Sequence, residues 1–248
     1  RLSYRGYDTS GIVVINDTTV DLRKDVGKIE QVAEKLKFRD TVGERGIIQL
    51  RWATFGPPTK DNAQPHLDCT GKIVGAHNGN IINSPQLRKK LTASGHYFHG
   101  INDGEIIPHL IEEYARCASD LAQATIDTTS VLEGDYAFVA CSVDKQKMYA
   151  VKKGSSLFVG IGKDFICVSS DLTAVLDHTN ILLPIEDGEF LEFDHSSYIL
   201  RELSTGERIH RIPKETQLKP EQVDKGEYPH FMIKEIHEIP LRLKALSN

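Results

Sequence analysis

The chain has 248 residues, 40% of them hydrophobic and 26% charged, which suits one large globular domain with a sizeable core. Its net charge of −5 is spread along the sequence and forms no basic stripe, so nucleic acid is not expected as a partner. No apolar stretch is long enough to span a membrane and no signal peptide is visible, so we expect a cytoplasmic protein without membrane contact.

The predicted elements are strands, then helices, then strands again. Strands are predicted over residues 10–16, 19–26, 43–50 and 73–76, in short runs between 136 and 170, and over 189–193 and 198–203. Helices are predicted over residues 27–38, 84–93, 103–115, 172–176 and 229–236. A turn at Asn16-Asp17 joins the first two strands into a hairpin, and the prolines between 55 and 70 indicate a loop.

This order excludes a regular β-α-β series and predicts an α+β fold in which two antiparallel sheets lie between helical layers. We therefore expect a four-layer αββα sandwich. Residues 1–212 are predicted to form this domain, and residues 213–248 a polar linker followed by a helix.

The cysteines and histidines give no sign of a metal site. Cys69, Cys117, Cys141 and Cys167 lack CxxC spacing, which favours reduced thiols. Cys141 and Cys167 lie in apolar runs and are expected in the core, whereas Cys69, in a polar loop, is the one expected to be exposed, without a catalytic role. The histidines have no Cys or carboxylate partners at ligand spacing, so we predict neither a metal ion nor a cofactor.

Two polar motifs directly follow apolar strands. Arg51-Trp52-Ala53-Thr54 comes after the strand 46–50, and His77-Asn78-Gly79-Asn80 comes after 73–76. An Asn amide beside a Gly backbone N–H can form an oxyanion hole, and an Arg at a strand end can hold a carboxylate through two parallel hydrogen bonds. These groups suit acyl transfer from an amino acid.

A protein that removes the amide nitrogen of glutamine needs such a set of contacts. Arg51 could hold the α-carboxylate, Asp103 the α-ammonium, and Asn78 with Gly79 the oxyanion. Trp52 and Thr54 would wall the pocket, with Trp52 shielding it and guarding the ammonia path. No residue is found for the thiolate, because the sequence opens with Arg1-Leu2-Ser3-Tyr4.

Each of these residues also has an ordinary structural interpretation. An Arg at a strand end is usually a surface ion-pair partner, Asn-Gly is usually a hairpin turn, and an Asp such as Asp103 is usually a helix cap. Their joint appearance in this order favours a site.

Seven motifs along the whole chain carry a resemblance to a known family: 2–8, 51–56, 62–66, 77–79, 102–105, 154–162 and 226–236. On these motifs the chain resembles the glutaminase domain of the glucosamine-6-phosphate synthases, or glutamine:fructose-6-phosphate aminotransferases (isomerizing). These are class II glutamine amidotransferases of the N-terminal-nucleophile (Ntn) hydrolase superfamily. The last motif resembles the family's junction with its sugar-isomerase domain, which this chain lacks.

The resemblance implies hydrolysis of L-glutamine to glutamate, with the ammonia used to make glucosamine 6-phosphate from fructose 6-phosphate held by the isomerase domain. It also implies a homodimer of the full-length protein. The nucleophile would be an N-terminal cysteine, activated by its own α-amino group, roughly twenty residues before Arg1, which leaves room for a missing first strand and helix. Arg5 would help to position this cysteine or would have a structural role in the turn 4–8. The printed chain is therefore expected to be inactive.

Two positions depart from the family's pattern. The family usually has His where this chain has Phe55 and again where it has Gln64; Gln64 can still form hydrogen bonds, whereas a phenyl ring cannot. Three alternatives stay open at this point. The chain could be a non-catalytic glutamine-binding or regulatory pseudo-amidotransferase, an amidophosphoribosyltransferase-like amidotransferase, or a structural α+β domain that meets a partner through residues 229–240.

Overall fold

The computed structural model describes residues 2–16, 19–218 and 226–246, so Arg1 and the Asp17 of the predicted turn lie outside the described residues. The helices are α1 (Ile29–Lys35), α2 (Ser84–Ala93), α3 (Ile106–Ala115), α4 (Leu121–Val131), α5 (Leu172–Leu176) and α6 (Phe231–Leu246), with 3-10 turns η1 (Leu2–Tyr4), η2 (Phe38–Asp40) and η3 (Asp103–Glu105). The strands are β1 (Thr9–Asn16), β2 (Thr19–Val26), β3 (Arg45–Arg51), β4 (His66–Leu67), β5 (Ile73–Ile81), β6 (Gly134–Ser142), β7 (Met148–Lys153), β8 (Phe158–Ile161), β9 (Ile166–Ser169), β10 (Ile181–Leu183), β11 (Glu189–Phe193), β12 (Tyr198–Glu202), β13 (Arg208–Ile209) and β14 (Lys214–Glu215).

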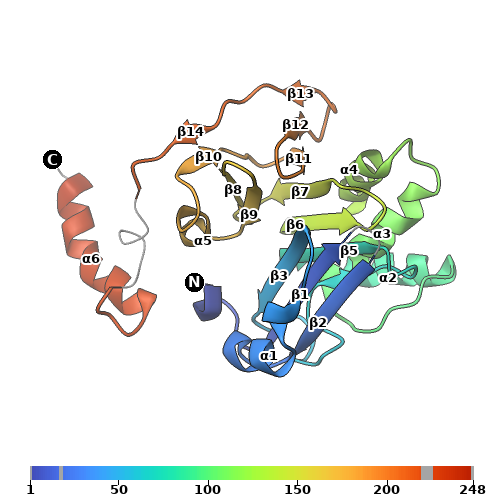
Figure 1. The fold of residues 1–248 in the computed structure, drawn as a ribbon, viewed down its shortest axis with the longest axis horizontal. Helices are drawn as coiled ribbons and strands as arrows, with labels where there is room; N and C mark the ends of the chain where they lie inside the picture. Colours follow the sequence, from blue (N-terminus) through green and yellow to red (C-terminus); the bar gives the residue numbers. More distant parts are fainter. Residues whose placement is uncertain (1, 17–18, 219–225, 247–248) are drawn as a thin grey trace.

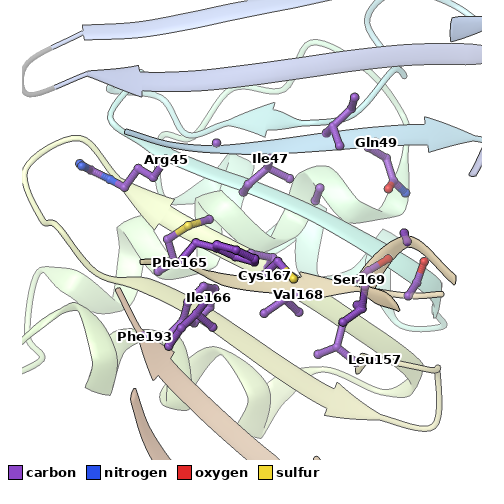
Figure 2. Close-up of a pocket in the computed structure, with 18 of the residues that line it drawn as sticks. Arg45, Ile47, Gln49, Leu157, Phe165, Ile166, Cys167, Val168, Ser169 and Phe193 are labelled. Carbon is purple, nitrogen blue, oxygen red and sulfur yellow. The ribbon is translucent and has the colours of Figure 1, made fainter. Parts of the chain in front are cut away.

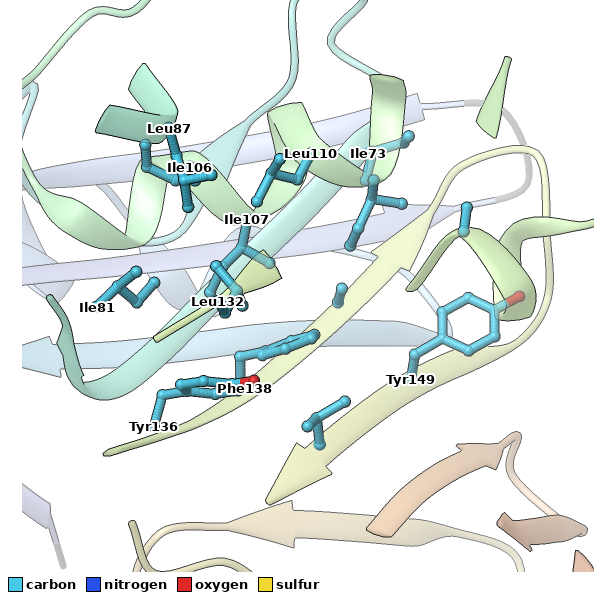
Figure 3. Packing of buried hydrophobic residues seen from close by; sticks show 14 of the residues in the cluster. Ile73, Ile81, Leu87, Ile106, Ile107, Leu110, Leu132, Tyr136, Phe138 and Tyr149 are labelled. Carbon is cyan, nitrogen blue, oxygen red and sulfur yellow. The ribbon is translucent and has the colours of Figure 1, made fainter. Parts of the chain in front are cut away.

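The largest sheet has seven strands in the order β13-β12-β11-β7-β6-β5-β4. Helices α2, α3 and α4 cover one of its faces (Figure 1). Side chains of α3, including Ile107 and Leu110, pack there against Phe138 and Tyr149 from the strands below (Figure 3). Burial of this aliphatic and aromatic surface is the main force that holds the helices on the sheet.

The opposite face of this sheet is covered by two smaller sheets. One has three strands in the order β2-β1-β3, and the other has four in the order β14-β10-β8-β9. Val13 and Ile47 of the first pack on Val74 of the large sheet, and a second apolar cluster joins Val159 to Leu191. Helix α1 contacts β1, and α5 contacts β8 and β9, so helices also cover this layer. The predicted αββα sandwich is confirmed.

The second layer is divided by a long slot between the edge strands β3 and β9. Each strand ends its sheet on this side, so their facing edges do not pair with each other. The slot encloses about 760 Å³, and Val139 of the large sheet is among the residues that line it. Ile47 and Gln49 of β3 line one side, and Cys167 and Ser169 of β9 line the other (Figure 2). Its sides are therefore unpaired strand edges, and its floor is largely apolar.

Several elements differ from their sequence predictions. Helix α4 was not predicted, because its threonines give a weak apolar stripe; the hydroxyl of Thr128 instead donates to the Ala124 carbonyl one turn earlier. Strand β4 lies within the predicted loop 55–70, where the Gln64–Pro65 peptide is cis. Helix α6 continues through Pro240 to Leu246, so its predicted end at residue 236 is wrong. No helix among residues 2–16, 19–218 and 226–246 has the length and apolar character to cross a bilayer.

Candidate active site

The sequence-predicted site residues meet in one cavity, at the place where β3 ends, the middle of β5 passes, and η3 begins. The cavity encloses about 340 Å³, near the lower end of the roughly 300–1,000 Å³ common for ligand sites. Its lining includes Arg5, Arg51, Trp52, Thr54, Gln64, Asn78, Gly79 and Asp103. Of the positions singled out from the sequence, Phe55 alone does not line it. These residues, far apart in sequence, thus face a space of amino-acid size.

Arg51 ends β3 and is nearly buried, with 5% of its surface exposed. Its guanidinium donates to the carbonyl oxygens of Phe55, Gly56 and Pro57, so it also holds the following loop in place. A guanidinium has five N–H donors, and these three bonds leave others for a ligand carboxylate. Burial lowers the pKa of Arg51, while the carboxylates of Asp103 and Asp8 raise it in opposition. The group therefore adds a positive charge to a poorly solvated site.

Asp103 is 2% exposed and is fixed by its neighbours. Its Oδ2 accepts from the Ile81 backbone N–H at 2.9 Å and lies 3.2 Å from Nε2 of His77. Burial raises the pKa of this carboxyl, but the contact with His77 and the backbone bond outweigh burial, so the pKa lies below the ordinary value. Asp103 is therefore ionised at neutral pH and provides the negative charge that an ammonium group would need.

The Asn78 amide is oriented by a residue that sequence reasoning did not assign. The Nε2 group of Gln49 donates to Asn78 Oδ1 at 2.8 Å and to the His77 carbonyl oxygen at 3.0 Å. Because Oδ1 is engaged in this way, the Nδ2 amino group of Asn78 is the part left to donate into the cavity. Gln49 lies two residues before Arg51 on β3, hence on the same face, and this spacing could have indicated it.

Gly79 adopts φ of +105°, a conformation that residues with a side chain rarely adopt. A Cβ at this position would lie 2.0 Å from the carbonyl oxygen of Asp135. Both observations explain why glycine follows Asn78 here. The ordinary interpretation of Asn78-Gly79 as a hairpin turn does not apply, because both residues pair within β5 against Ala137 and Tyr136 of β6.

The Gln64 side chain forms two hydrogen bonds with the backbone of β5. Its Oε1 accepts from the His77 N–H at 2.7 Å, and its Nε2 donates to the His77 carbonyl oxygen at 3.2 Å. Gln64 is therefore a buried part of the cavity wall. The exposed Phe55 does not line the cavity, and its contribution is the backbone carbonyl that accepts from Arg51. Trp52 is 58% exposed at the cavity edge, with its ring 5.7 Å from that of Tyr7.

Arg5 connects the N-terminal turn to the far side of the slot. It donates to the Ser170 carbonyl oxygen at 2.7 Å, and its guanidinium lies 3.7 Å from Asp171. The cavity and the slot are continuous, because Leu2, Gln49, His77, Asn78 and Ser170 line both. The slot therefore meets the cavity beside Asn78.

A second polar cluster contradicts the reasoning that the histidines lack partners for a metal. Cys69, His96, His109 and Glu112 each offer one ligand atom, and these atoms all lie within 4.8 Å of one another. Cys69 is half-buried against them, and Cys117 is the exposed cysteine instead; Cys141 is buried as predicted, whereas Cys167 is only partly buried. Of these four residues, only His109 and Glu112, three residues apart on a helix, could have been predicted as neighbouring metal ligands from sequence spacing.

The cavity geometry and the fold agree with comparisons to known proteins. A sequence profile for the glutamine amidotransferase domain matches residues 51–177. The chain therefore belongs to the glutamine amidotransferase domain family. This result confirms the family predicted from the motifs.

The most informative relatives are longer proteins. The isomerizing glutamine–fructose-6-phosphate aminotransferase of Thermococcus kodakarensis is 40% identical over 245 residues, which cover 98% of this chain and 41% of the relative. The protein of the same name from Pyrococcus horikoshii is 39% identical over 98% of this chain and 41% of its own length. The chain thus spans about two fifths of these relatives.

Solved structures share the fold. The glutamine phosphoribosylpyrophosphate amidotransferase of B. subtilis, solved with ADP and GMP, aligns with a TM-score of 0.71 and 26% identity over 82% of this chain and 45% of its own. Its sequence identity is well below that of the aminotransferases, which favours the latter branch over the amidophosphoribosyltransferase alternative.

Proposed function

We propose that this chain is the glutamine-hydrolysing part of a longer isomerizing glutamine–fructose-6-phosphate aminotransferase. The observation that carries the proposal is the convergence of Arg51, Asp103, Asn78 and Gly79 on one cavity of about 340 Å³. The similarity to aminotransferases over 98% of the chain supports the same assignment. The product would be glutamate, and the ammonia would pass to a sugar phosphate bound by the rest of the protein.

The cavity suggests one orientation for L-glutamine. The remaining N–H groups of Arg51 would bind the α-carboxylate, and the ionised Asp103 would bind the α-ammonium. The side-chain carbonyl would then point toward Asn78 Nδ2 and the backbone N–H of Gly79. Donors held in place before the reaction stabilise the oxyanion of a tetrahedral intermediate without reorganisation, which is the main contribution expected from this chain.

The nucleophile would reach the site through the slot between β3 and β9. A strand lying there would pair with both free edges and cover the apolar floor, which would join the two small sheets into one. Its end would lie beside Asn78, where the slot meets the cavity. This position suits a terminal cysteine whose thiol gives its proton to its own α-amino group as the sulfur attacks the amide carbon. The C–N bond of the amide would then break, the nitrogen would take up that proton and leave as ammonia, and water would release glutamate from the sulfur.

The predicted linker 213–248 begins too early, because β14 still pairs with β10 in the sandwich. The part of the chain after β14 would connect this domain to a sugar-isomerase domain that binds fructose 6-phosphate. Helix α6 stands apart from the sandwich (Figure 1). It exposes apolar side chains that a neighbouring domain could cover, namely Met232, Ile236, Ile239, Leu241 and Leu243. The relatives extend well beyond the region they share with this chain, which supports a further domain in the longer protein.

Glutamate release by the full-length protein tests the proposal. We expect release of glutamate from L-glutamine, together with loss of glutamine binding in Arg51→Ala. A matched control is Arg39→Ala, which changes an exposed arginine outside the cavity. Binding without turnover would favour the pseudo-amidotransferase alternative, and absence of binding at saturating glutamine would favour a structural domain.

A further inference from the structure

The cluster of Cys69, His96, His109 and Glu112 lies outside the glutamine cavity and has no part in the proposed reaction. Three separate segments supply it. Cys69 follows β4, His96 follows α2, and His109 with Glu112 lies on α3. Both histidine side chains are fully buried.

The distances in the cluster match a tetrahedral metal site. Cys69 Sγ lies 3.4 Å from Nδ1 of both His96 and His109. Glu112 Oε2 lies 3.1 Å from His96 Nδ1 and 3.5 Å from His109 Nδ1. Metal–ligand bonds of about 2.0–2.3 Å at tetrahedral angles place neighbouring ligand atoms roughly 3.3–3.6 Å apart. Four of the six distances between the ligand atoms are therefore close to this range, and all six lie within 4.8 Å.

The chemistry of the ligands also points to one ion. We propose that Cys69, His96, His109 and Glu112 bind a zinc ion as a closed, structural site. One thiolate, two imidazoles and one carboxylate form a mixed set that zinc accepts in tetrahedral geometry, whereas magnesium and calcium prefer oxygen ligands.

A carboxylate on the far side of the His96 ring favours the ring orientation and proton position that a metal ion at Nδ1 requires. Glu113 Oε2 lies 3.0 Å from His96 Nε2, and Arg116 holds the same oxygen at 2.8 Å. When Nε2–H donates to Glu113, the lone pair of Nδ1 faces the cluster, close to the lone pairs of Glu112. Metal-bound histidines usually have such a carboxylate partner on the second ring nitrogen.

Charge balance favours the same ion. A thiolate and a carboxylate together carry two negative charges, which a divalent cation neutralises, so the loaded site is neutral despite its burial. With four protein ligands the ion has no open position. Its role would be to tie the β4–β5 turn and the segment after α2 to helix α3.

Metal analysis of the unaltered full-length protein, purified without chelators, tests the proposal. We expect about one zinc per chain, as a site with four protein ligands requires. After removal of zinc, titration with Co²⁺ should produce the visible bands of tetrahedral cobalt and a near-ultraviolet thiolate-to-cobalt band. Absence of both zinc and the cobalt bands would overturn the proposal.

Two cysteine variants locate the metal. Cys69→Ser should lose the thiolate-to-cobalt band and most of its zinc, whereas Cys117→Ser, which changes an exposed cysteine outside the cluster, should keep both. Equal loss in both variants, or retention of the thiolate band in a folded Cys69→Ser protein, would overturn the assignment. Circular dichroism of each variant establishes that it is folded. The cobalt titration of the unaltered protein does not depend on either variant.

Discussion

The glutamine cavity and the Cys69 cluster both include residues of the segment formed by η3 and α3. They differ in whether their polar atoms face an open space or face one another. In the glutamine cavity, neighbours orient Asn78 and Asp103 and leave donor and acceptor capacity directed at an open space. In the other cluster, the ligand atoms of Cys69 and His109 face one another at 3.4 Å. An open space suits a substrate that enters and leaves, whereas polar atoms that face one another suit a permanently bound metal ion.

Both clusters depend on the packing of α3. Its residues Ile106, Ile107 and Ile111 are fully buried against the seven-stranded sheet. This packing fixes Asp103 just before the helix and His109 within it. Whether the two clusters are independent can be tested by changing a residue of one cluster and measuring the ligand binding assigned to the other.

The largest effect is expected for Asn78→Ala. Loss of one oxyanion donor typically lowers kcat by about 100- to 1,000-fold, because the bond is strongest in the transition state. We expect this loss in glutamate release by the full-length protein, with little change in KM and no change in zinc content. Asn180→Ala, at an exposed asparagine outside the cavity, is the control. A rate within about threefold of the unaltered protein would remove Asn78 from the oxyanion hole.

Asp103→Asn should weaken binding of the amino acid. A hydrogen bond to a charged group is worth about 1.5–3 kcal/mol, which corresponds to roughly 10- to 100-fold in affinity. Calorimetry with L-glutamate measures this directly, because the product is not turned over. Asp40→Asn, at an exposed site, should bind as the unaltered protein does. Equal affinities in both variants would show that Asp103 does not contact the ammonium.

Glu113→Gln should affect the other cluster alone. Loss of a carboxylate behind a metal-bound histidine typically lowers metal affinity about 10- to 100-fold. Competition with a chromophoric chelator measures zinc affinity, and Glu133→Gln, at an exposed residue, is the matched control. Glutamine affinity should stay constant. A coupled loss of zinc and glutamine binding would mean that the clusters are not independent.

The smallest effect concerns pH. The folded pKa of Asp103 is lowered, so its contribution to stability is present above the unfolded value of about 3.9 and is lost as pH falls through the folded value. The difference in unfolding free energy between the unaltered protein and Asp103→Asn should therefore shrink on acidification from about pH 6 to about pH 3.5. Urea unfolding at each pH measures this difference in unfolding free energy. A difference that grows on acidification would contradict the lowered pKa of Asp103.

Local patterns predicted much of this fold. The hairpin, the loop 55–70 and the helix after Asp103 follow from strand periodicity, prolines and an apolar stripe. The contacts between distant segments did not follow. Gln49 orients Asn78 across two sheets, and Cys69 meets His96 only because α2 and α3 pack side by side. Such contacts depend on tertiary packing, which spacing along one chain does not encode.

A crystal structure of the full-length protein with L-glutamate tests the central claim most directly. The account predicts that the ligand lies in the cavity with its α-carboxylate on Arg51, its α-ammonium on Asp103 and its side-chain carboxylate toward Asn78 and Gly79. Glutamate bound at another surface, or bound here with its α-carboxylate toward Asp103, would contradict the account.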